Sequence, residues 1–245
     1  MAEKIKDRVL QILGDDSTYD DSISIMNQIC DDAIWETATA LPPRLLMSVA
    51  TQPTDPMGTG GNAATGDTET IDDTLVLQVY RVERTGAPNI ESSYIRRLCE
   101  PISLEESIKA TDSNSIHYAT KESPVYWITS VGSSSTLKVF PNATGISAQE
   151  TELPLGDACT EIWKYDRQDD FEWESDDDFD FIPEEAEEVI IHRIALKILD
   201  HKIADAGTQE EDQEMVTILS ATRQLLEKNT LDLMNQLKVR WENKV

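Results

Sequence analysis

Residues 183–239 read PEEAEEVIIHRIALKILDHKIADAGTQEEDQEMVTILSATRQLLEKNTLDLMNQLKV, and this stretch decides the fold because it predicts two long helices joined by a turn. Pro183 suits the first turn of a helix, and the acidic residues after it favour the positive end of the helix dipole. We expect the first helix to end at Gly207 and the second to cover about 210–239. Residues 183–245 therefore predict a C-terminal helical hairpin. The second helix carries the following side chains at helical spacing: Met215, Ile218, Leu219, Thr222, Leu225, Leu226, Leu233 and Leu237.

The N-terminal region, residues 1–50, predicts the helices that complete this bundle. A first helix is expected over residues 3–13, where apolar side chains recur on one face and a glycine follows. A second helix begins after the Asp and Ser residues at 20–24 and ends at Pro42, because proline disfavours helical backbone in the residue before it. Pro43 can open a short third helix.

A long loop separates these helices from the middle of the chain. Residues 51–73 begin with TQPTDPMGTGGNAATGDTET, which is rich in Thr, Gly and Pro and poor in large apolar side chains. Loops of this length are uncommon in compact domains unless they bind a partner or stay flexible. We expect a flexible loop here.

The middle of the chain, residues 74–182, predicts a β-rich insert. Its strands are marked by β-branched and aromatic residues, and Ser103 with Glu106 has the spacing of a capping box before a short helix. We expect the strands to pair locally into one small antiparallel sheet. The predicted strands cover residues 75–82, 124–129, 136–141 and 160–165, with a hairpin loop at 131–135. The fold class is therefore α+β: mainly a helical bundle, with an inserted small antiparallel β domain and the C-terminal helical hairpin.

Aromatic and acidic side chains alternate at the end of this insert. Residues 169–183 read DDFEWESDDDFDFIP. A period of two places the rings on one face of an extended segment and the carboxylates on the other. We expect an edge strand or an extended arm.

The net charge limits the partners that the chain can have. Its 47 acidic residues against 21 basic ones give a charge of −26, and residues 151–182 alone, with 12 acidic and 2 basic residues, carry −10. Such a surface repels phosphate backbones and anionic lipid. It can still line a path along which DNA moves without sticking. No apolar run approaches the roughly 18 to 20 residues that span a bilayer, so we expect a soluble protein made in a cytoplasm.

The sequence holds no recognisable catalytic, cofactor or metal motif. Cys30, Cys99 and Cys159 lack CxxC spacing, and we expect free, buried thiols. His192 and His201 are nine residues apart on one predicted helix and project from nearly opposite faces, so they cannot share one metal ion. The acidic residues at 176–187 have the spacing of a calcium loop, but Phe stands where that loop requires Gly. We expect no enzyme activity and no cofactor.

Two small basic groupings are candidate contact sites. Arg96 and Arg97, near Lys109 and Lys121, are expected to pair with carboxylates of a neighbouring subunit rather than with nucleic acid. The cluster of Lys238, Arg240 and Trp241 close to the C-terminus has the composition of a protein-interface anchor. A simple frayed helix end is the alternative interpretation of this cluster.

Two stretches in combination resemble the head-to-tail adaptor proteins, also called connector or neck proteins, of tailed bacteriophages. YIRRLCEPISLEESIKATDSNSIHYATKESPVYWITS at 94–130, followed by STLKVFPNATG at 135–145, is similar to their β insert. FIPEEAEEVIIHRIALKILDHKIADAGTQEEDQEMVTILSATRQLLEKNTLDLMNQL at 181–237 is similar to their closing helix pair, which an Ile-Pro step precedes and an EED-type turn divides.

The resemblance implies a virion structural protein. About twelve copies would form a homo-oligomeric ring in the neck, between head and tail, that joins the portal to the tail proteins and continues the DNA channel without binding DNA specifically. In many members a C-terminal segment docks onto the portal, which makes Lys238, Arg240 and Trp241 candidates for portal or tail binding.

Ring assembly would also bury the aromatic arm and repeat its acidic residues around an axis. The expected inter-subunit residues are Arg96, Arg97, Phe171, Trp173, Phe179 and Phe181. The expected channel-facing residues are Asp169, Asp170, Glu172, Glu174, Asp176, Asp177 and Asp178.

Two other functions fit the residues. An acidic interaction protein that mimics DNA would place carboxylates like phosphates on one face and occupy a basic cleft of its partner. An enzyme that uses acidic pairs, with or without a metal ion, is the remaining alternative.

Overall fold

The structure is a computed structural model that describes residues 5–14, 22–51, 63–64, 68–86, 93–132, 134–141, 158–167, 171–173, 181–208 and 213–242. The chain divides into two compact units. A helical unit contains residues 1–49 and 167–245, and a β unit contains residues 50–166. Both helices and small, mostly antiparallel sheets are present, so the predicted α+β class is confirmed.

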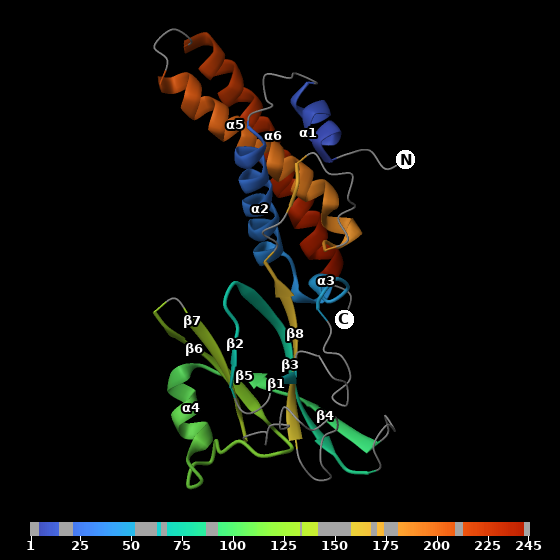
Figure 1. Ribbon diagram of the computed structural model, residues 1–245, viewed down its shortest axis with the longest axis vertical. Helices are drawn as coiled ribbons and strands as arrows, with labels where there is room; N and C mark the ends of the chain where they lie inside the picture. The colour runs from blue at the N-terminus through green and yellow to red at the C-terminus, as the bar shows by residue number, and fades with distance from the viewer. Residues whose placement is uncertain are drawn as a thin grey trace. The chain divides into compact units, whose positions relative to one another are not determined.

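The helical unit is built around α5 (Glu187–Thr208), which packs against helices from both ends of the chain (Figure 1). Buried apolar side chains occur on every side of its first turns, because Val189, Ile190, Ile191 and Leu199 point in four directions around the helix and all are buried. A helix that is apolar all round must be surrounded by other elements. The helices around it are α1 (Ile5–Leu13), α2 (Ile23–Ala40) and α6 (Gln213–Glu242).

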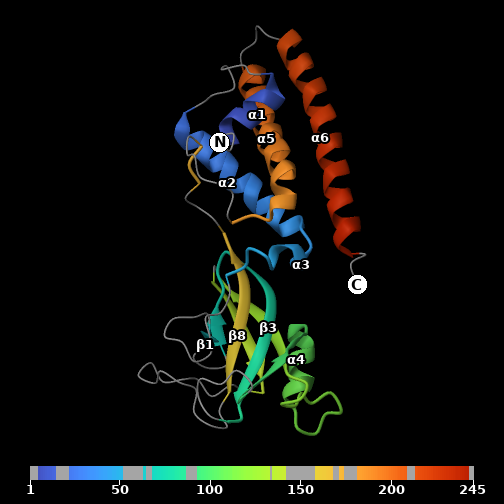
Figure 2. The ribbon, with the colours of Figure 1, turned by 90° about the vertical axis from the view of Figure 1, so that its right-hand side faces the viewer.

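The long C-terminal helices form the predicted hairpin, with α5 and α6 side by side (Figures 1 and 2). The 3-10 turn Glu184–Ala186 precedes α5, and Pro183 stands just before that turn. Gly207 lies inside the last turn of α5 rather than beyond its end, so the predicted end of this helix is early by one residue.

The N-terminal helices pack on α5 through one face each. Ile5, Val9 and Leu13 are the buried residues of α1, at the spacing of one helical face. The helix α2 ends before Pro42, and α3 (Pro43–Leu46) begins with a proline, as predicted. Ion pairs add to this packing: Arg8 pairs with Glu187 of α5, and Lys197 of α5 lies 2.7 Å from Glu36 of α2.

The β unit contains two sheets instead of the single sheet that was predicted. One sheet has the order β1-β8-β3-β4 and the other β2-β7-β6-β5. Antiparallel pairing of β3 with β8 joins segments about eighty residues apart, so the sheet is not local, and β5 with β6 is a parallel pair. The strands are β1 (Ala63–Ala64), β2 (Thr68–Thr70), β3 (Thr74–Arg84), β4 (Tyr94–Leu98), β5 (Glu100–Pro101), β6 (Val125–Val131), β7 (Ser134–Phe140) and β8 (Ala158–Asp166).

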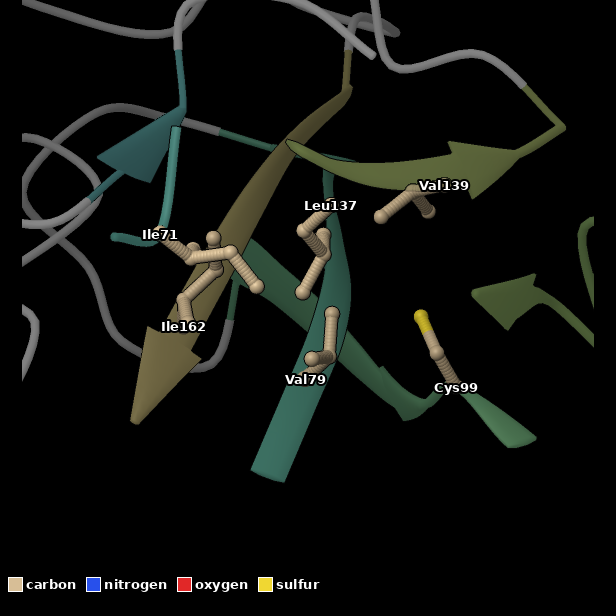
Figure 3. Packing of buried hydrophobic residues seen from close by; sticks show 6 residues of the cluster. All are labelled: Ile71, Val79, Cys99, Leu137, Val139 and Ile162. Atoms are coloured by element: carbon tan, nitrogen blue, oxygen red, sulfur yellow. The ribbon is translucent and has the colours of Figure 1, made fainter. Parts of the chain in front are cut away.

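Buried apolar side chains from the two sheets meet in one cluster (Figure 3). Val79 of β3 and Ile162 of β8 are register partners and supply one side. Leu137 and Val139 of β7 supply the other. The two sheets therefore pack face to face as a small sandwich.

The helix α4 (Leu104–Thr111) covers part of the second sheet. Its Ala110 packs with Ala119 and with Val125 of β6. The predicted capping box is present: the Glu106 amide donates to Ser103 Oγ at 3.2 Å, and the Ser103 amide donates to the Glu106 carboxylate at 2.9 Å. The Ser103 amide and the Ser103 hydroxyl both donate to the Glu106 carboxylate, and these two bonds lower the pKa of Glu106. The predicted hairpin between β6 and β7 is confirmed too, and Gly132 in its turn has a φ of +68°, which favours glycine.

The division into units differs from the predicted ranges in two places. Residues 167–182, assigned to the β-rich insert, group with the helical unit. The range 51–73, expected as a flexible loop, contains the short strands β1 and β2, which pair with β8 and β7.

Candidate interaction surfaces

The predicted C-terminal cluster is split by the geometry of α6. Lys238 and Trp241 line a hollow of about 620 Å³ together with residues 40–44, at the junction of α2 and α3. Arg240 lines a different hollow of about 500 Å³, with Asp232 and Val239 among its neighbours. Positions two apart on a helix differ by about 200°, so Lys238 and Arg240 cannot face the same way. The half-buried Trp241 is part of the first hollow and not an exposed anchor.

An apolar stripe on α6 is exposed. Ile218 and Leu225 are 60% and 62% exposed. The neighbours Leu219 and Leu226 are buried. One residue is about 100° of helix, so two separate apolar stripes run along α6 and only one of them packs inside the unit. The adjacent apolar pairs of α6, such as Ile218 with Leu219, mark this offset in the sequence.

The aromatic residues of the arm lie inside the helical unit where the structure describes them. Trp173 is completely buried, and its backbone amide donates to Asn27 Oδ1 of α2 at 2.8 Å. Phe171 is buried as well, and its ring meets that of half-buried Phe181 edge-on at 6.4 Å. A contact of Trp173 or Phe171 with a neighbouring subunit is therefore not supported, because their own unit covers both rings. Phe179 lies outside the described residues.

Of the predicted channel-facing carboxylates, the structure describes Glu172 alone. Its side chain is exposed between the buried Phe171 and Trp173, which agrees with the expected alternation at this point. Asp169, Asp170, Glu174, Asp176, Asp177 and Asp178 lie outside the described residues.

Arg96 and Arg97 each pair with a carboxylate of their own chain, and their contact with a neighbouring subunit stays a prediction. Arg96 donates to Glu161 of β8 at 3.1 Å, and that carboxylate is almost fully buried. Arg97 lies on the other face of β4, 3.9 Å from Glu83 of β3. Lys121 reaches the same carboxylate, also at 3.9 Å.

A second exposed apolar group occurs in the β unit. Leu104 and Ile108 lie one turn apart on α4, and both are exposed. Ile116, in the turn after this helix, is 95% exposed. Such side chains mark a candidate contact surface of the β unit.

The cysteines are free and buried, as predicted. Burial raises the pKa of Cys99 and of Cys159 to about 12, and it raises the pKa of Cys30 as well. Thiols that stay protonated at neutral pH are poor nucleophiles and poor metal ligands. In the part of the chain that the structure describes, no group of His, Cys, Asp and Glu has an arrangement that could hold a metal ion.

No known protein-family model matches the chain, and no curated protein is significantly similar to it. Among the described residues, no helix is long and apolar enough to cross a membrane.

Proposed function

We propose that the chain is a head-to-tail adaptor of a tailed bacteriophage, a structural protein without enzyme activity. Copies of it would form a ring in the neck of the virion, join the portal to the tail and continue the DNA channel. The ring is homo-oligomeric, and about twelve copies are expected from the resemblance. DNA passes nearby without specific binding.

The observation that carries this proposal is the way in which the helical unit is built. Residues 1–49 and 167–245 form it together, and the β unit is a single insertion between them. The resemblance of residues 94–145 and 181–237 to the adaptors implies the same plan, a helical body with an inserted β part. The proposal is supported by this arrangement, a helical unit made of both chain ends with the β unit inserted between them.

The exposed stripe of α6 gives the proposal a contact surface. Ile218 and Leu225 are seven residues apart, nearly two turns, so they lie on one line along the helix. An exposed apolar stripe on a highly charged chain is typical of a protein-protein contact. In a ring, the same stripe of every copy would pack against its neighbour.

The charge supports a place beside DNA. At −26 the chain repels phosphate, so a ring of it can surround DNA without retaining it. The net charge of −10 over residues 151–182 makes that segment the first candidate for the channel wall.

Co-purification with the portal protein of the same phage tests the proposal. We expect a stable complex with several copies of this chain per portal ring. Some adaptors assemble only on their partner, so a monomer in isolation agrees with the proposal. Absence of binding to the portal contradicts it.

The same charge favours a DNA mimic as the second candidate function. Such a protein would bind a basic, DNA-binding partner one to one, and the complex would weaken steeply with salt. Salt-sensitive binding to such a partner, together with no binding to portal, would select this function.

A further inference from the structure

We propose that the β unit holds an oxyanion-binding site formed by Arg81, Arg97 and Lys121. The site belongs to the inner face of the β1-β8-β3-β4 sheet. Arg81 of β3 is the register partner of Thr160 on β8 and of Arg97 on β4, so these three side chains form one row across the sheet. Cross-strand partners in antiparallel sheets point to the same face.

This polar row directly follows the apolar core. The preceding residues on the same face are Val79 and Ile162, which belong to the buried cluster of the sandwich. Arg81 is only 4% exposed, and its Nε donates to the Pro141 carbonyl at 3.3 Å. The chain therefore holds a guanidinium at the margin of its core and fixes that group's orientation.

The row holds more positive than negative charge. Among the described residues, Glu83 is the one carboxylate that pairs with the cations of this site. Three cations, Arg81, Arg97 and Lys121, surround Glu83. Arg81 donates to Glu83 Oε2 at 3.2 Å, whereas Arg97 Nη1 lies 3.9 Å from the same oxygen and Lys121 Nζ lies 3.9 Å from Oε1. Two arginines directly opposite each other in a sheet repel unless an anion compensates them. One carboxylate leaves a local charge of +2, in a chain whose total charge is −26.

Two polar atoms of the row lack a hydrogen bond among the described residues. One is Nη1 of Arg97, and the other is the hydroxyl of Thr160, a residue that is completely buried. Leaving a buried polar group without a partner is costly, so such atoms point to a missing ligand. Both groups can donate, which selects a ligand rich in acceptors.

The exposed cations of the site and the geometry of the guanidinium group determine which kind of ligand can bind. Lys121 is 56% exposed and the Arg97 side chain 24%, so the site borders solvent, although Nη1 of Arg97 is itself buried. A guanidinium binds two oxygens of one ligand in parallel. A phosphate group or a carboxylate therefore fits, whereas chloride does not. Free phosphate and a carboxylate side chain of another molecule share this chemistry.

Calorimetric titration of the full-length chain with inorganic phosphate tests the site, at an ionic strength held constant with chloride. We expect saturable binding of one phosphate per chain. The variants Arg97→Gln and Lys121→Gln should each weaken it at least about tenfold, the equivalent of one lost charged hydrogen bond. Glu83→Gln should strengthen binding, because it removes the competing negative charge.

Lys109→Gln is the matched control, since it removes a cation from exposed α4 and should leave phosphate binding unchanged. Circular dichroism shows whether each variant is folded, and Lys121→Gln alters only an exposed side chain, so it keeps the test valid if Arg97→Gln unfolds. No saturable binding to the wild type, or equal binding by Arg97→Gln and Lys109→Gln, overturns the proposal.

Titration with acetate separates the two sources of the ligand. Weaker binding of acetate than of phosphate selects a free tetrahedral ion. Equal binding selects a carboxylate of another molecule. The experiment uses the chain without its portal, so its result is independent of the adaptor proposal.

Discussion

Trp173 is the largest completely buried side chain among the described residues, although it lies in a segment whose neighbours are acidic. We predict that Trp173→Ala lowers the free energy of unfolding of the helical unit by about 3–5 kcal/mol, because it leaves a large cavity. Denaturant unfolding followed by far-UV circular dichroism measures the change. Glu172→Ala, at the exposed neighbour, should change it by less than about 0.5 kcal/mol. Equal losses for the two variants would show that Trp173 does not pack in the core.

The adjacent arginines of β4 should differ in their effect on stability. Arg96→Ala removes a 3.1 Å contact from the carboxylate of Glu161, which is only 3% exposed. We expect a loss of about 1–3 kcal/mol, the typical effect of a weakened buried polar contact. Arg97→Ala should cost less, because no hydrogen bond joins Arg97 to Glu83 at 3.9 Å. Thermal unfolding of both variants is the measurement, and a larger loss for Arg97→Ala would contradict this account.

The buried thiols and Tyr165 predict sensitivity to alkali. Burial raises the pKa of Cys99, Cys159 and Tyr165 to about 12, from 9.0 for the cysteines and 10.0 for the tyrosine. The folded chain therefore keeps these protons at a pH where the unfolded chain has lost them. These three groups leave the free energy of unfolding unchanged up to about pH 9 and should lower it between pH 9 and 12.

Thiol labelling at pH 8 checks the same burial independently. Cys30, Cys99 and Cys159 should react with a disulfide reagent only after denaturation. Rapid labelling of the native chain, or stability that rises above pH 9, would show that these groups are not buried as described.

The α6 helix carries one stripe into the core and leaves another exposed. We predict that Ile218→Ser with Leu225→Ser leaves the helical content unchanged but weakens assembly on the portal at least about tenfold, because buried apolar contact area is lost. Light scattering coupled to size exclusion measures the assembly.

Leu231→Ser is the matched control for the α6 variants. Leu231 is 57% exposed, like Ile218 and Leu225, but lies about 120° of helix away from Leu225. Its replacement should leave assembly unchanged. Equal weakening by the control would mean that the stripe is not the contact.

Long helices and aromatic strands could be predicted from the sequence, because their signals are local. The helices α2, α5 and α6 follow from apolar spacing and bounding prolines, and β3 and β8 follow from β-branched and aromatic residues. The strand β4 was missed, since YIRRL has charged residues on both faces and its arginines are explained only by partners on other strands. The pairing of β4 with β3 cannot be predicted from the spacing of apolar residues in β4 alone.

The two units show which parts of the fold depend on distant contacts. The helical unit needs both ends of the chain, and the sequence predicted that residues 1–50 and 183–245 share one bundle, whereas residues 167–182 were assigned to the β-rich insert. Trp173 was expected in an exposed arm because aromatic and acidic residues alternate around it. In the structure its amide donates to Asn27 and its ring is buried in the helical unit. The charged row around Glu83 could not be predicted either, since its members come from β3, β4 and the segment after α4.

The most direct test of the adaptor function is electron microscopy of the purified chain mixed with the portal protein of the same phage. We predict a second ring, coaxial with the portal ring and built from several copies of this chain, with a channel running through both. A chain that stays strictly monomeric and leaves every portal ring bare would contradict the account.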